Sequence, residues 1–457
     1  MGIFGAMTTA ISGLSAQSYA LERISDNIAN SQTTGYKRSD ATFADFVPNS
    51  PSNRQALSSV NAFSRPTNTV QGDIVNSAVN THIAINGDGY FIIAEQRDTV
   101  DGLPVFTGQD LYTRRGDFAF DQNGYLVNTT GYYLQGLSID PTTGNPSGST
   151  PSVIRISNDF LAANPTTQIG YRANLASYPL TAEADPTVPD SELLDPLDYV
   201  NDPRAGFDEF VQGVDANQFI DQSVSGGAVT AYTATGATAN VQFRWAKTDT
   251  TLTGGTDTWN LFYLEDSTAT GANPAWRNIG VDYVFDTQGQ LNPPISSSII
   301  TNLSVNGLNL GNINLNHGSL GVTQFADSNG IAKVTDINQD GYSAGELIDV
   351  AVTEKGRVTA SYTNGLKVDL AEITLASFNG DNGLAKADGG AFRETIISGA
   401  PILGALGVVV GNALEGSNTD IAEEFTKLIV TQQAYAANTR IVSTADEMVT
   451  EALNMIR

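Results

Sequence analysis

The residues that could do chemistry in this sequence are few, and none has the spacing that a catalytic site demands. His82 and His317 are the only side chains whose ordinary pKa lies near neutrality, because the 457-residue chain has no cysteine. Neither histidine lies in a nucleophile or metal-ligand pattern, and the sequence contains no phosphate-loop, zinc-protease or nucleophile-elbow motif. We therefore interpret both histidines as structural, and we expect no enzyme and no cofactor.

One stretch is similar to a calcium-binding loop. Asp336, Asn338, Asp340 and Gly341 occupy positions 1, 3, 5 and 6 of the EF-hand pattern, whose position 12 carries a bidentate acid. Leu347 stands at that twelfth position, and the flanking residues alternate as strands do. A tight turn between strands is the favoured interpretation, with metal binding as the alternative.

Two further features could form a ligand site. An acidic run from Glu183 to Asp221, relieved only by Arg204, could gather carboxylates around a cation, but such a run is more often a solvated surface. The three tryptophans could line a glycan site, but they stand in alternating segments that favour core packing: Trp245, Trp259 and Trp276.

The charge of the chain is concentrated in its middle. With 49 acids against 23 bases the net charge is −26, and residues 39–420 carry −25 of it. Nearly neutral ends are expected if they pack together while the middle faces water. The absence of a basic surface excludes duplex nucleic acid as an expected partner.

Both ends of the chain carry apolar residues at heptad spacing, which predicts two helices that pair with each other or with copies. Gln17 and Thr439 interrupt the stripes, so we expect the helices to become ordered only on assembly. The residues of the N-terminal stripe are Met7, Ile11, Leu14, Leu21, Ile24 and Ile28. Those of the C-terminal stripe are Phe425, Leu428, Tyr435, Val442, Val449, Leu453 and Ile456.

Between the helices, alternating apolar residues and Asn-Gly or Asp-Gly turns predict hairpin-built β structure. The predicted fold class is mainly β domains nested in the chain, with N- and C-terminal α-helices pairing as a coiled-coil-like core domain. The predicted domains are 1–30 plus 420–457 as helical core, 31–69 plus 401–419 as connector, 70–147 plus 321–400 as inner β domain, and 148–320 as inserted outer β domain. The connector is expected to be loosely structured from Ser39 to about Thr69. Strands after the insert would complete the sheet begun before it.

No segment predicts membrane insertion. The most apolar window, residues 400–414, is too short and too rich in glycine to span a bilayer. The first base is Arg23, so the first twenty residues lack the basic region of a secretory signal. We expect a cytoplasmic chain, unless it is exported by a signal that is not cleaved.

Four stretches, which cover roughly half of the chain, resemble the bacterial flagellar rod and hook protein family. The first runs from Asn27 to Lys37, the second from Ile85 through Val127, the third from Leu414 to Asp420 and the fourth from Gln432 to Met448. The positions that carry the family motifs at the two ends are Asn27, Asn30, Thr34, Gly35, Tyr36, Asn418, Asp420 and Asn438.

This resemblance implies a structural subunit that forms a flexible tubular filament. In that family the terminal helices form a core tube, the inner β domain the next shell, and the insert faces outward. The implied partners are other copies, the distal rod, hook cap and hook-filament junction proteins, and the flagellar type III export apparatus. The implied location is the flagellum. The alternatives are a rod-type subunit and a secreted β-rich adhesin or enzyme. The absence of cysteine excludes the covalent cross-linking of some hooks.

Overall fold

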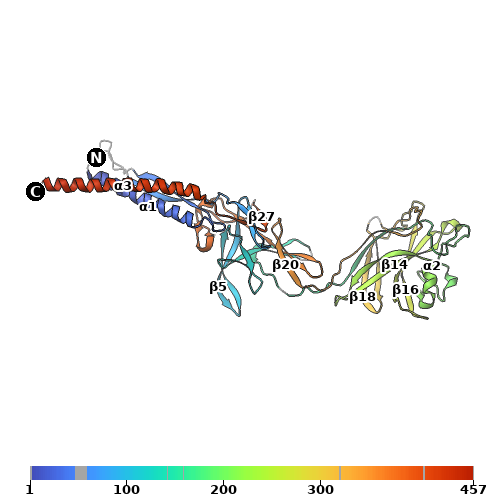
Figure 1. Ribbon diagram of the computed structural model, residues 1–457. Helices are drawn as coiled ribbons and strands as arrows, with labels where there is room; N and C mark the ends of the chain where they lie inside the picture. The colour runs from blue at the N-terminus through green and yellow to red at the C-terminus, as the bar shows by residue number, and fades with distance from the viewer. Residues whose placement is uncertain are drawn as a thin grey trace. The chain divides into compact units, whose positions relative to one another are not determined.

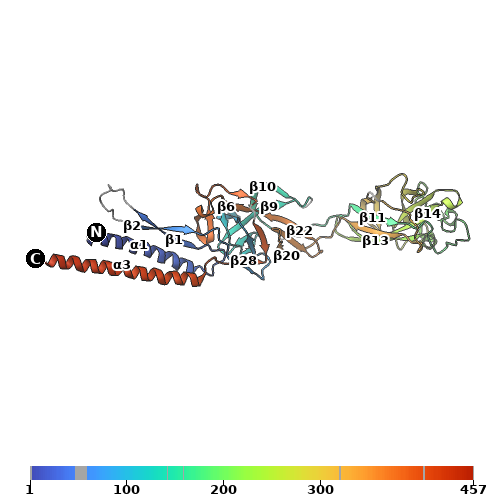
Figure 2. The same ribbon diagram turned by 90° about the horizontal axis from the view of Figure 1, so that it is seen from above.

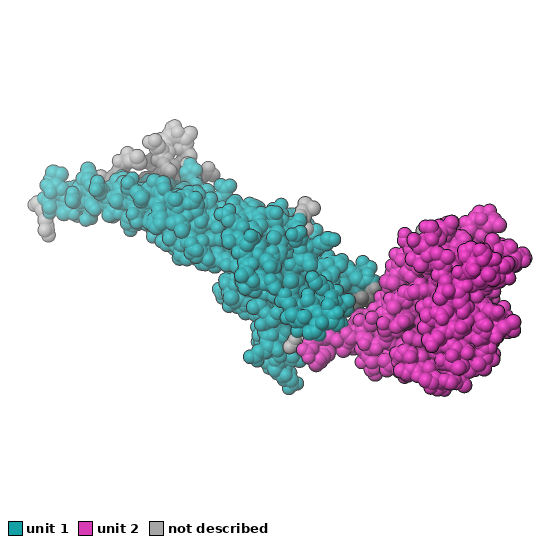
Figure 3. Space-filling model, turned by 45° about the vertical axis from the view of Figure 1, so that its right-hand side comes forward, with its two compact units in different colours: residues 1–159, 347–457 teal, residues 160–346 magenta. Residues whose placement is uncertain are grey.

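The computed structural model describes residues 3–46, 59–140, 143–157, 159–318, 321–404 and 407–455. Its contacts divide the chain into two compact units (Figure 3). Unit 1 consists of Met1–Asp159 and Leu347–Arg457, and unit 2 is Phe160–Glu346. The predicted fold class, β domains with helices at both ends, is confirmed.

Two long helices form one end of unit 1. Helices α1 (Ile3–Ala29) and α3 (Ile421–Met455) run side by side (Figures 1 and 2). Asp420 caps the N-terminus of α3: its Oδ1 atom accepts hydrogen bonds from the backbone N–H groups of Ala422 at 2.8 Å and Glu423 at 3.2 Å. In the described ranges, neither these helices nor α2 combines the length and apolarity needed to cross a bilayer.

Small and polar residues occupy the most buried positions of the helix pair. Ala10, Ala16 and Ala20 are buried on α1, and Thr431 and Ala445 are buried on α3. Small side chains let two helix backbones approach closely. The helices therefore pair within one chain without burying most of their larger apolar side chains.

A β-hairpin packs along α1 in a stretch where the sequence predicts a loose connector. Strands β1 (Ser39–Phe46) and β2 (Ser59–Pro66) pair antiparallel in continuous register from Ser39↔Pro66 to Phe46↔Ser59. Both strands contact α1. The prediction of a loose connector is wrong for these strands, because their backbones are hydrogen-bonded to each other; residues 47–58 lie outside the described residues.

The strands that follow the insert complete the sheet begun before it, as the sequence predicts. β22 pairs with β9, β23 with β5, and β25 with β6. The sheet follows the order β20-β21-β22-β9-β5-β6-β25-β24. The strands of this β domain before the insert are β3 (Ile74–Asn76), β4 (Ile83–Asn86), β5 (Tyr90–Val100), β6 (Leu103–Thr113), β7 (Phe118–Phe120), β8 (Leu126–Asn128), β9 (Tyr132–Ile139) and β10 (Pro146–Val153). Those after it are β20 (Leu347–Val352), β21 (Arg357–Tyr362), β22 (Lys367–Ile373), β23 (Leu375–Ser377), β24 (Ala385–Lys386), β25 (Ala391–Arg393), β26 (Ile402–Leu403), β27 (Val408–Gly411) and β28 (Ala413–Glu415).

The second predicted connector also belongs largely to this β domain. β26 pairs with β23, β27 with β4, and β28 with β3. Residues 401–419 are predicted as part of a connector, but these three strands pair with strands of the β domain. Each of them forms a short antiparallel pair with a strand earlier in the chain. The local sequence does not reveal these strand pairs.

Unit 2 is built from two sheets that share a core. One sheet has the order β17-β18-β11-β19 and the other β12-β16-β15-β14-β13. Trp245 and Trp259 are fully buried in that core, and Trp276 is buried in a smaller adjoining cluster, so the prediction of core packing is confirmed. The elements are β11 (Gln168–Asn174), β12 (Phe210–Gln212), α2 (Ala216–Asp221), β13 (Val224–Tyr232), β14 (Thr238–Asp249), β15 (Asp257–Leu264), β16 (Pro274–Phe285), β17 (Ser297–Val305), β18 (Leu308–Asn316) and β19 (Lys333–Gln339).

The insert begins and ends later than predicted. β10 pairs with β9 and so stays in unit 1, whereas β19 pairs antiparallel with β11 and so belongs to unit 2. The predicted boundaries of 148 and 320 are therefore replaced by Phe160 and Glu346. Strand pairing decides which sheet a strand belongs to. The change in amino-acid composition along the chain does not reveal that pairing.

The calcium-like stretch lies at the end of β19. The Asp340 carboxylate accepts hydrogen bonds from the Thr167 backbone N–H at 2.8 Å, the Thr167 hydroxyl at 2.6 Å and the Gln168 backbone N–H at 3.0 Å. These donors tie the carboxylate to the segment before β11. Among the described residues, no group of three or more acidic, histidine or cysteine side chains is arranged to hold a metal ion.

Candidate functional site at the root of the terminal helices

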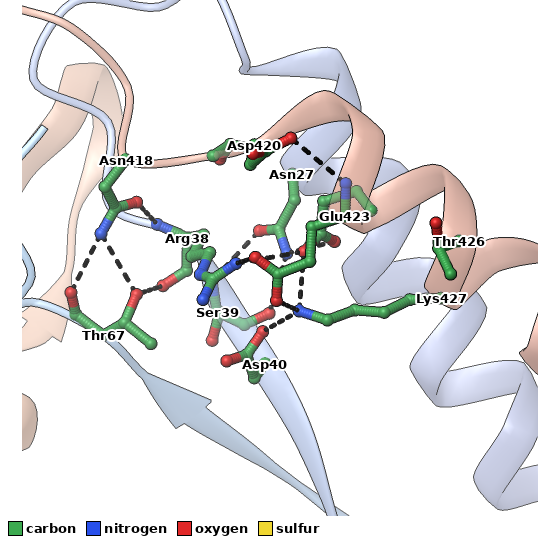
Figure 4. Close-up of polar contacts among 12 residues, drawn as sticks. Asn27, Arg38, Ser39, Asp40, Thr67, Asn418, Asp420, Glu423, Thr426 and Lys427 are labelled. Atoms are coloured by element: carbon green, nitrogen blue, oxygen red, sulfur yellow. Dashed lines mark hydrogen bonds and ion pairs between the residues drawn. The ribbon is translucent and has the colours of Figure 1, made fainter. Parts of the chain in front are cut away.

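Motif residues from the two ends of the chain meet where α1 ends and α3 begins (Figure 4). Asn27 is 1% exposed and lies on the last turns of α1. Its side-chain Nδ2 donates to the Ser39 carbonyl at 3.2 Å and to the Glu424 carboxylate at 3.0 Å, while its Oδ1 accepts from the Ser39 N–H at 3.0 Å. One asparagine therefore joins α1, the start of β1 and the first turn of α3.

Asn418 makes the corresponding connection from the C-terminal side. Its Oδ1 accepts the Arg38 backbone N–H at 2.7 Å, and its Nδ2 donates to the Thr67 and Val70 carbonyls, each at 3.1 Å. The amide thus satisfies backbone groups at both ends of the β1–β2 hairpin (Figure 4). Asp420 follows two residues later and caps α3, so the stretch 418–420 fixes where the helix begins.

A charged cluster surrounds this connection. The Lys427 ammonium lies 3.2 Å from an oxygen of Asp40 and 3.0 Å from one of Glu423 and one of Glu424, and the Arg38 guanidinium lies 2.8 Å from Glu423. Partial burial alone would lower the pKa of Lys427, but hydrogen bonds to the three carboxylates outweigh it and raise that pKa. Hydrogen bonds from Lys427 and then Arg38 hold the pKa of Glu423 below its ordinary value.

A buried ion-pair group lies next to the cluster. The Lys37 ammonium contacts Glu415 Oε1 at 2.5 Å and the Val70 carbonyl at 2.7 Å, and Arg114 approaches the other carboxylate oxygen at 3.2 Å. Lys37 and Glu415 have no exposed side-chain surface. Burial lowers the pKa of Lys37, and the neighbouring Glu415 carboxylate opposes that shift. These charges fasten the segment after α1 to β28 and to the end of β6.

The other N-terminal motif residues shape the turn after α1. The Tyr36 hydroxyl donates to Asn27 Oδ1 at 3.3 Å. Asn30 bonds locally to the Asp26 carbonyl at 2.9 Å, and Thr34 is half-buried in the same turn. Gly35 does not end the helix as a cap, since α1 ends at Ala29. It has a φ of +67° and lies against Arg115, where a Cβ atom would come within 2.7 Å of the backbone nitrogen.

Asn438 lies away from this root, on the helix pair itself. A Cβ atom placed on Gly13 of α1 would come within 3.0 Å of Asn438 Nδ2 on α3. Glycine on one helix therefore accommodates an amide on the other. This contact gives a packing role to Asn438, which the sequence indicates only as a position of the family motif.

The predicted apolar stripe is only partly buried in one chain. Ile24 is buried, and seven further members are half-buried: Met7, Leu14, Leu21, Ile28, Leu428, Val442 and Val449. Four members are exposed, with exposed fractions of 40–63%: Ile11, Phe425, Tyr435 and Leu453. Ile456 lies outside the described residues. These four side chains therefore remain accessible to solvent in one chain.

Sequence analysis missed several residues of this site. Arg114, Glu415 and Lys37 stand in the motif stretches, but their pairing joins three distant segments. Glu424 lies in the first turn of α3 and is fully buried. A carboxylate in the first turn of a helix is ordinarily interpreted as a solvent-exposed residue that favours the helix N-terminus. A local signal existed for Lys37, which is the one charged side chain in the stretch from Asn27 to Lys37.

Models of flagellar protein families match three parts of this chain. The flagella basal body rod protein model matches residues 7–37, the flagellar hook protein FlgE/F/G D1 domain matches 84–164, and the flagellar basal body rod FlgEFG protein C-terminal model matches 410–455. The first and third contain the two halves of the site described above. The second covers the strands of unit 1 that lead to the insert.

Relatives with similar full-length sequences are also found. The flagellar hook protein FlgE of Brucella suis is 29% identical over 462 residues and that of Caulobacter vibrioides 27% over 598, each alignment covering all of both chains. That of Salmonella typhimurium is 25% identical and covers 98% of each chain. The crystal structure of Helicobacter pylori flagellar hook protein FlgE2 shares the fold, with a TM-score of 0.51 and 17% identity, over 75% of this chain and all of that one.

Fold and site together define a β protein whose two chain ends form a joint helical domain, with polar contacts from both ends at its root. The matched regions narrow this class further. In them, and over the full length of its relatives, the chain is similar to bacterial flagellar rod and hook proteins.

Proposed function

We propose that this chain is the structural subunit of the bacterial flagellar hook. It polymerises into a flexible tubular filament that transmits torque from rod to filament while bending. The observation that carries the proposal is the root of the helix pair, where Asn27, Asn418 and Glu424 join both chain ends to the β domain. Full-length similarity to hook proteins supports the hook over a rod-type subunit.

Assembly uses the apolar stripe that one chain leaves accessible. Ile11, Phe425, Tyr435 and Leu453 are exposed on helices whose own contact is made by small residues. Covering such side chains with a second copy removes apolar surface from water. When copies contact head to tail and the rotation between successive copies does not close into a ring, they form an open filament.

The acidic unit 2 forms the outer surface of the filament, and its contacts slide as the hook bends. The acidic run from Glu183 to Asp221 supports this role, because charged surfaces lose little apolar burial when contacts shift.

Flagellar hook proteins are part of the flagellum. Export by the type III apparatus without a cleaved signal, and contacts with distal rod, cap and junction proteins, belong to the same proposal. The role is structural, with no catalytic step and no cofactor.

Electron microscopy of the purified, polymerised chain tests this proposal. Curved tubes are expected; straight rigid tubes would favour the rod-type alternative, and a monomer that never polymerises would refute both. Leu428→Asp is expected to prevent polymerisation while both β units stay folded, whereas Leu197→Asp, at a side chain 89% exposed on unit 2, serves as the control. Intact tubes from Leu428→Asp would contradict the role of the stripe.

Removal of residues 160–346 tests the role of unit 2. Tube formation is expected to persist, with altered stiffness or curvature, because the two ends of the insert lie together, with Leu161 paired to Gly345 by an isolated bridge. Total loss of assembly by a chain whose unit 1 remains folded would refute the outer position of unit 2.

A further inference from the structure

The longest stretch without charged residues near the C-terminus exposes several apolar side chains to solvent. Residues 395–414 contain no charged side chain, in a chain with 49 acids and 23 bases. Apolar side chains of this stretch that are exposed in the structure are Ile396, Ile397, Ile402, Leu403 and Val408. Two adjacent residues stand out, with exposed fractions of 102% for Ile396 and 81% for Ile397.

These two isoleucines, which we term the isoleucine knob, are held by a closed loop. The Thr395 hydroxyl oxygen accepts the N–H groups of Ile397 and Ser398, both at 3.2 Å, and the Ser398 hydroxyl oxygen accepts the Thr395 N–H at 2.9 Å. Thr395 also donates to the Gly383 carbonyl at 2.6 Å. The loop therefore presents both apolar side chains to solvent in a fixed position, which costs free energy unless a partner covers them.

Unit 1 also has a recess whose lining combines apolar side chains with polar ones, including Asp121 and Asp349. A cavity of about 420 Å³ lies between the residues around Val79, the end of β7 and the start of β20. Val79, Phe120 and Ile348 are exposed apolar side chains in its lining, and Ile156 and Val350 are buried there. Its size falls in the range of roughly 300–1,000 Å³ typical of protein binding pockets. No residue of the knob loop lines it.

We propose that the isoleucine knob of one copy inserts into this recess on a second copy. The inference rests on the proposed function, since it specifies one contact of the polymer. Knob and recess use different residues of the same compact unit, so their contact is heterologous and propagates from copy to copy. A second copy is the favoured occupant because knob and recess lie on the same chain, and a segment without charged side chains adds nothing to the repulsion between chains of net charge −26.

The absence of cysteine allows a direct test. Chains carrying Ile397→Cys and Ile348→Cys are mixed, polymerised and oxidised, and disulfide-linked dimers are expected on a non-reducing gel. A disulfide forms only where the two Cα atoms come within about 7 Å. Ile397→Cys mixed with Leu308→Cys, a partly exposed site on unit 2, is the control and should give no dimer.

A second variant measures the contribution of the contact. Ile396→Asp combined with Ile397→Asp should leave the fold intact, as judged by circular dichroism, because both side chains are exposed. The concentration required for polymerisation is expected to rise at least about tenfold, against no change for Leu197→Asp.

Three results would overturn the inference. Polymers without the mixed disulfide would refute the contact while the proposed function stands. Dimers from Ile397→Cys alone would indicate knob-to-knob pairing instead. Failure of the unmodified chain to polymerise would refute the inference together with the proposed function.

Discussion

Lys37 and Glu415 stand 378 positions apart in the chain, yet their side chains meet at 2.5 Å with no exposed surface on either. Glu415 also accepts the Gly72 N–H at 2.9 Å and an Arg114 N–H at 3.2 Å. The segment leaving α1 and the strand leading to α3 are thereby fixed to the same β domain. The direction in which both helices leave that domain depends on this buried group.

Lys37→Met is expected to destabilise unit 1 by about 3–5 kcal/mol, because it leaves the buried Glu415 carboxylate with Arg114 as its remaining cation. Denaturant unfolding followed by circular dichroism measures the loss. Tryptophan fluorescence reports unit 2 alone, since all three tryptophans lie there, and should be unchanged. Glu265→Gln, which removes a partly exposed pair with Arg277, is the control and should cost at most about 1 kcal/mol. An equal cost for both variants would contradict the role of the buried group.

Asn27→Ala is expected to loosen the root of the helix pair. It leaves the buried Ser39 N–H and the Glu424 carboxylate without their shared partner, at a cost of about 1–3 kcal/mol. Limited proteolysis of the terminal helices, together with thermal unfolding, measures the effect. Asn30→Ala is the matched control, since its side chain makes only local hydrogen bonds in the turn. Equal behaviour of the two variants would show that Asn27 does not join the chain ends.

Gly35→Ala is expected to destabilise unit 1 more than Gly102→Ala. Both glycines have positive φ, at +67° and +78°, so each alanine carries the left-handed backbone cost of about 1–2 kcal/mol. A Cβ atom at residue 35 also meets the Arg115 backbone at 2.7 Å, whereas one at residue 102 meets nothing within 4 Å. The difference in unfolding free energy between the two variants isolates this steric contact. No difference would mean that the Gly35 turn can shift away from Arg115.

Unit 2 is expected to lose stability as the pH falls below about 6.5, the ordinary pKa of histidine. Burial lowers the pKa of His317 in the folded chain, although its hydrogen bond to the Tyr171 carbonyl opposes the shift. In the window between the lowered and the ordinary pKa the unfolded chain binds more protons, so acid favours unfolding. Urea unfolding followed by tryptophan fluorescence should show a slope of at most about 1.4 kcal/mol per pH unit. The slope should disappear in His317→Gln, and its persistence would assign it to other groups.

The terminal helices are expected to gain order on assembly. Within one chain the buried side chains of these helices are mostly small or polar, as at Ala10, Ala20 and Thr431, and Gly13 lies against Asn438. Contacts of this kind bury little apolar surface, so isolated helices should open readily. Hydrogen exchange in dilute monomer and in polymer compares the two states. Strong protection of both helices in the dilute monomer would contradict the expectation.

Local patterns sufficed to predict the elements with strong periodicity. Heptad spacing gave both helices, and Asp420 gave the start of α3, because caps and helix faces depend on residues within one or two turns. Alternation and Asn-Gly turns gave the hairpin strands of the β domain. The motif residues near Asn27 and Asn418 pointed to the region where the two chain ends meet.

The sequence alone determined that this chain has helical ends, a β middle and an acidic surface, since each of these follows from composition or from neighbours along the chain. Only the tertiary structure decided that β19 belongs with β11, that β26–β28 join earlier strands, and that alanine and glycine make the helix contact. It also decided which charges are buried. Strand partners, side-chain burial and helix rotation are set by residues hundreds of positions apart, and their packing leaves no trace in the local sequence.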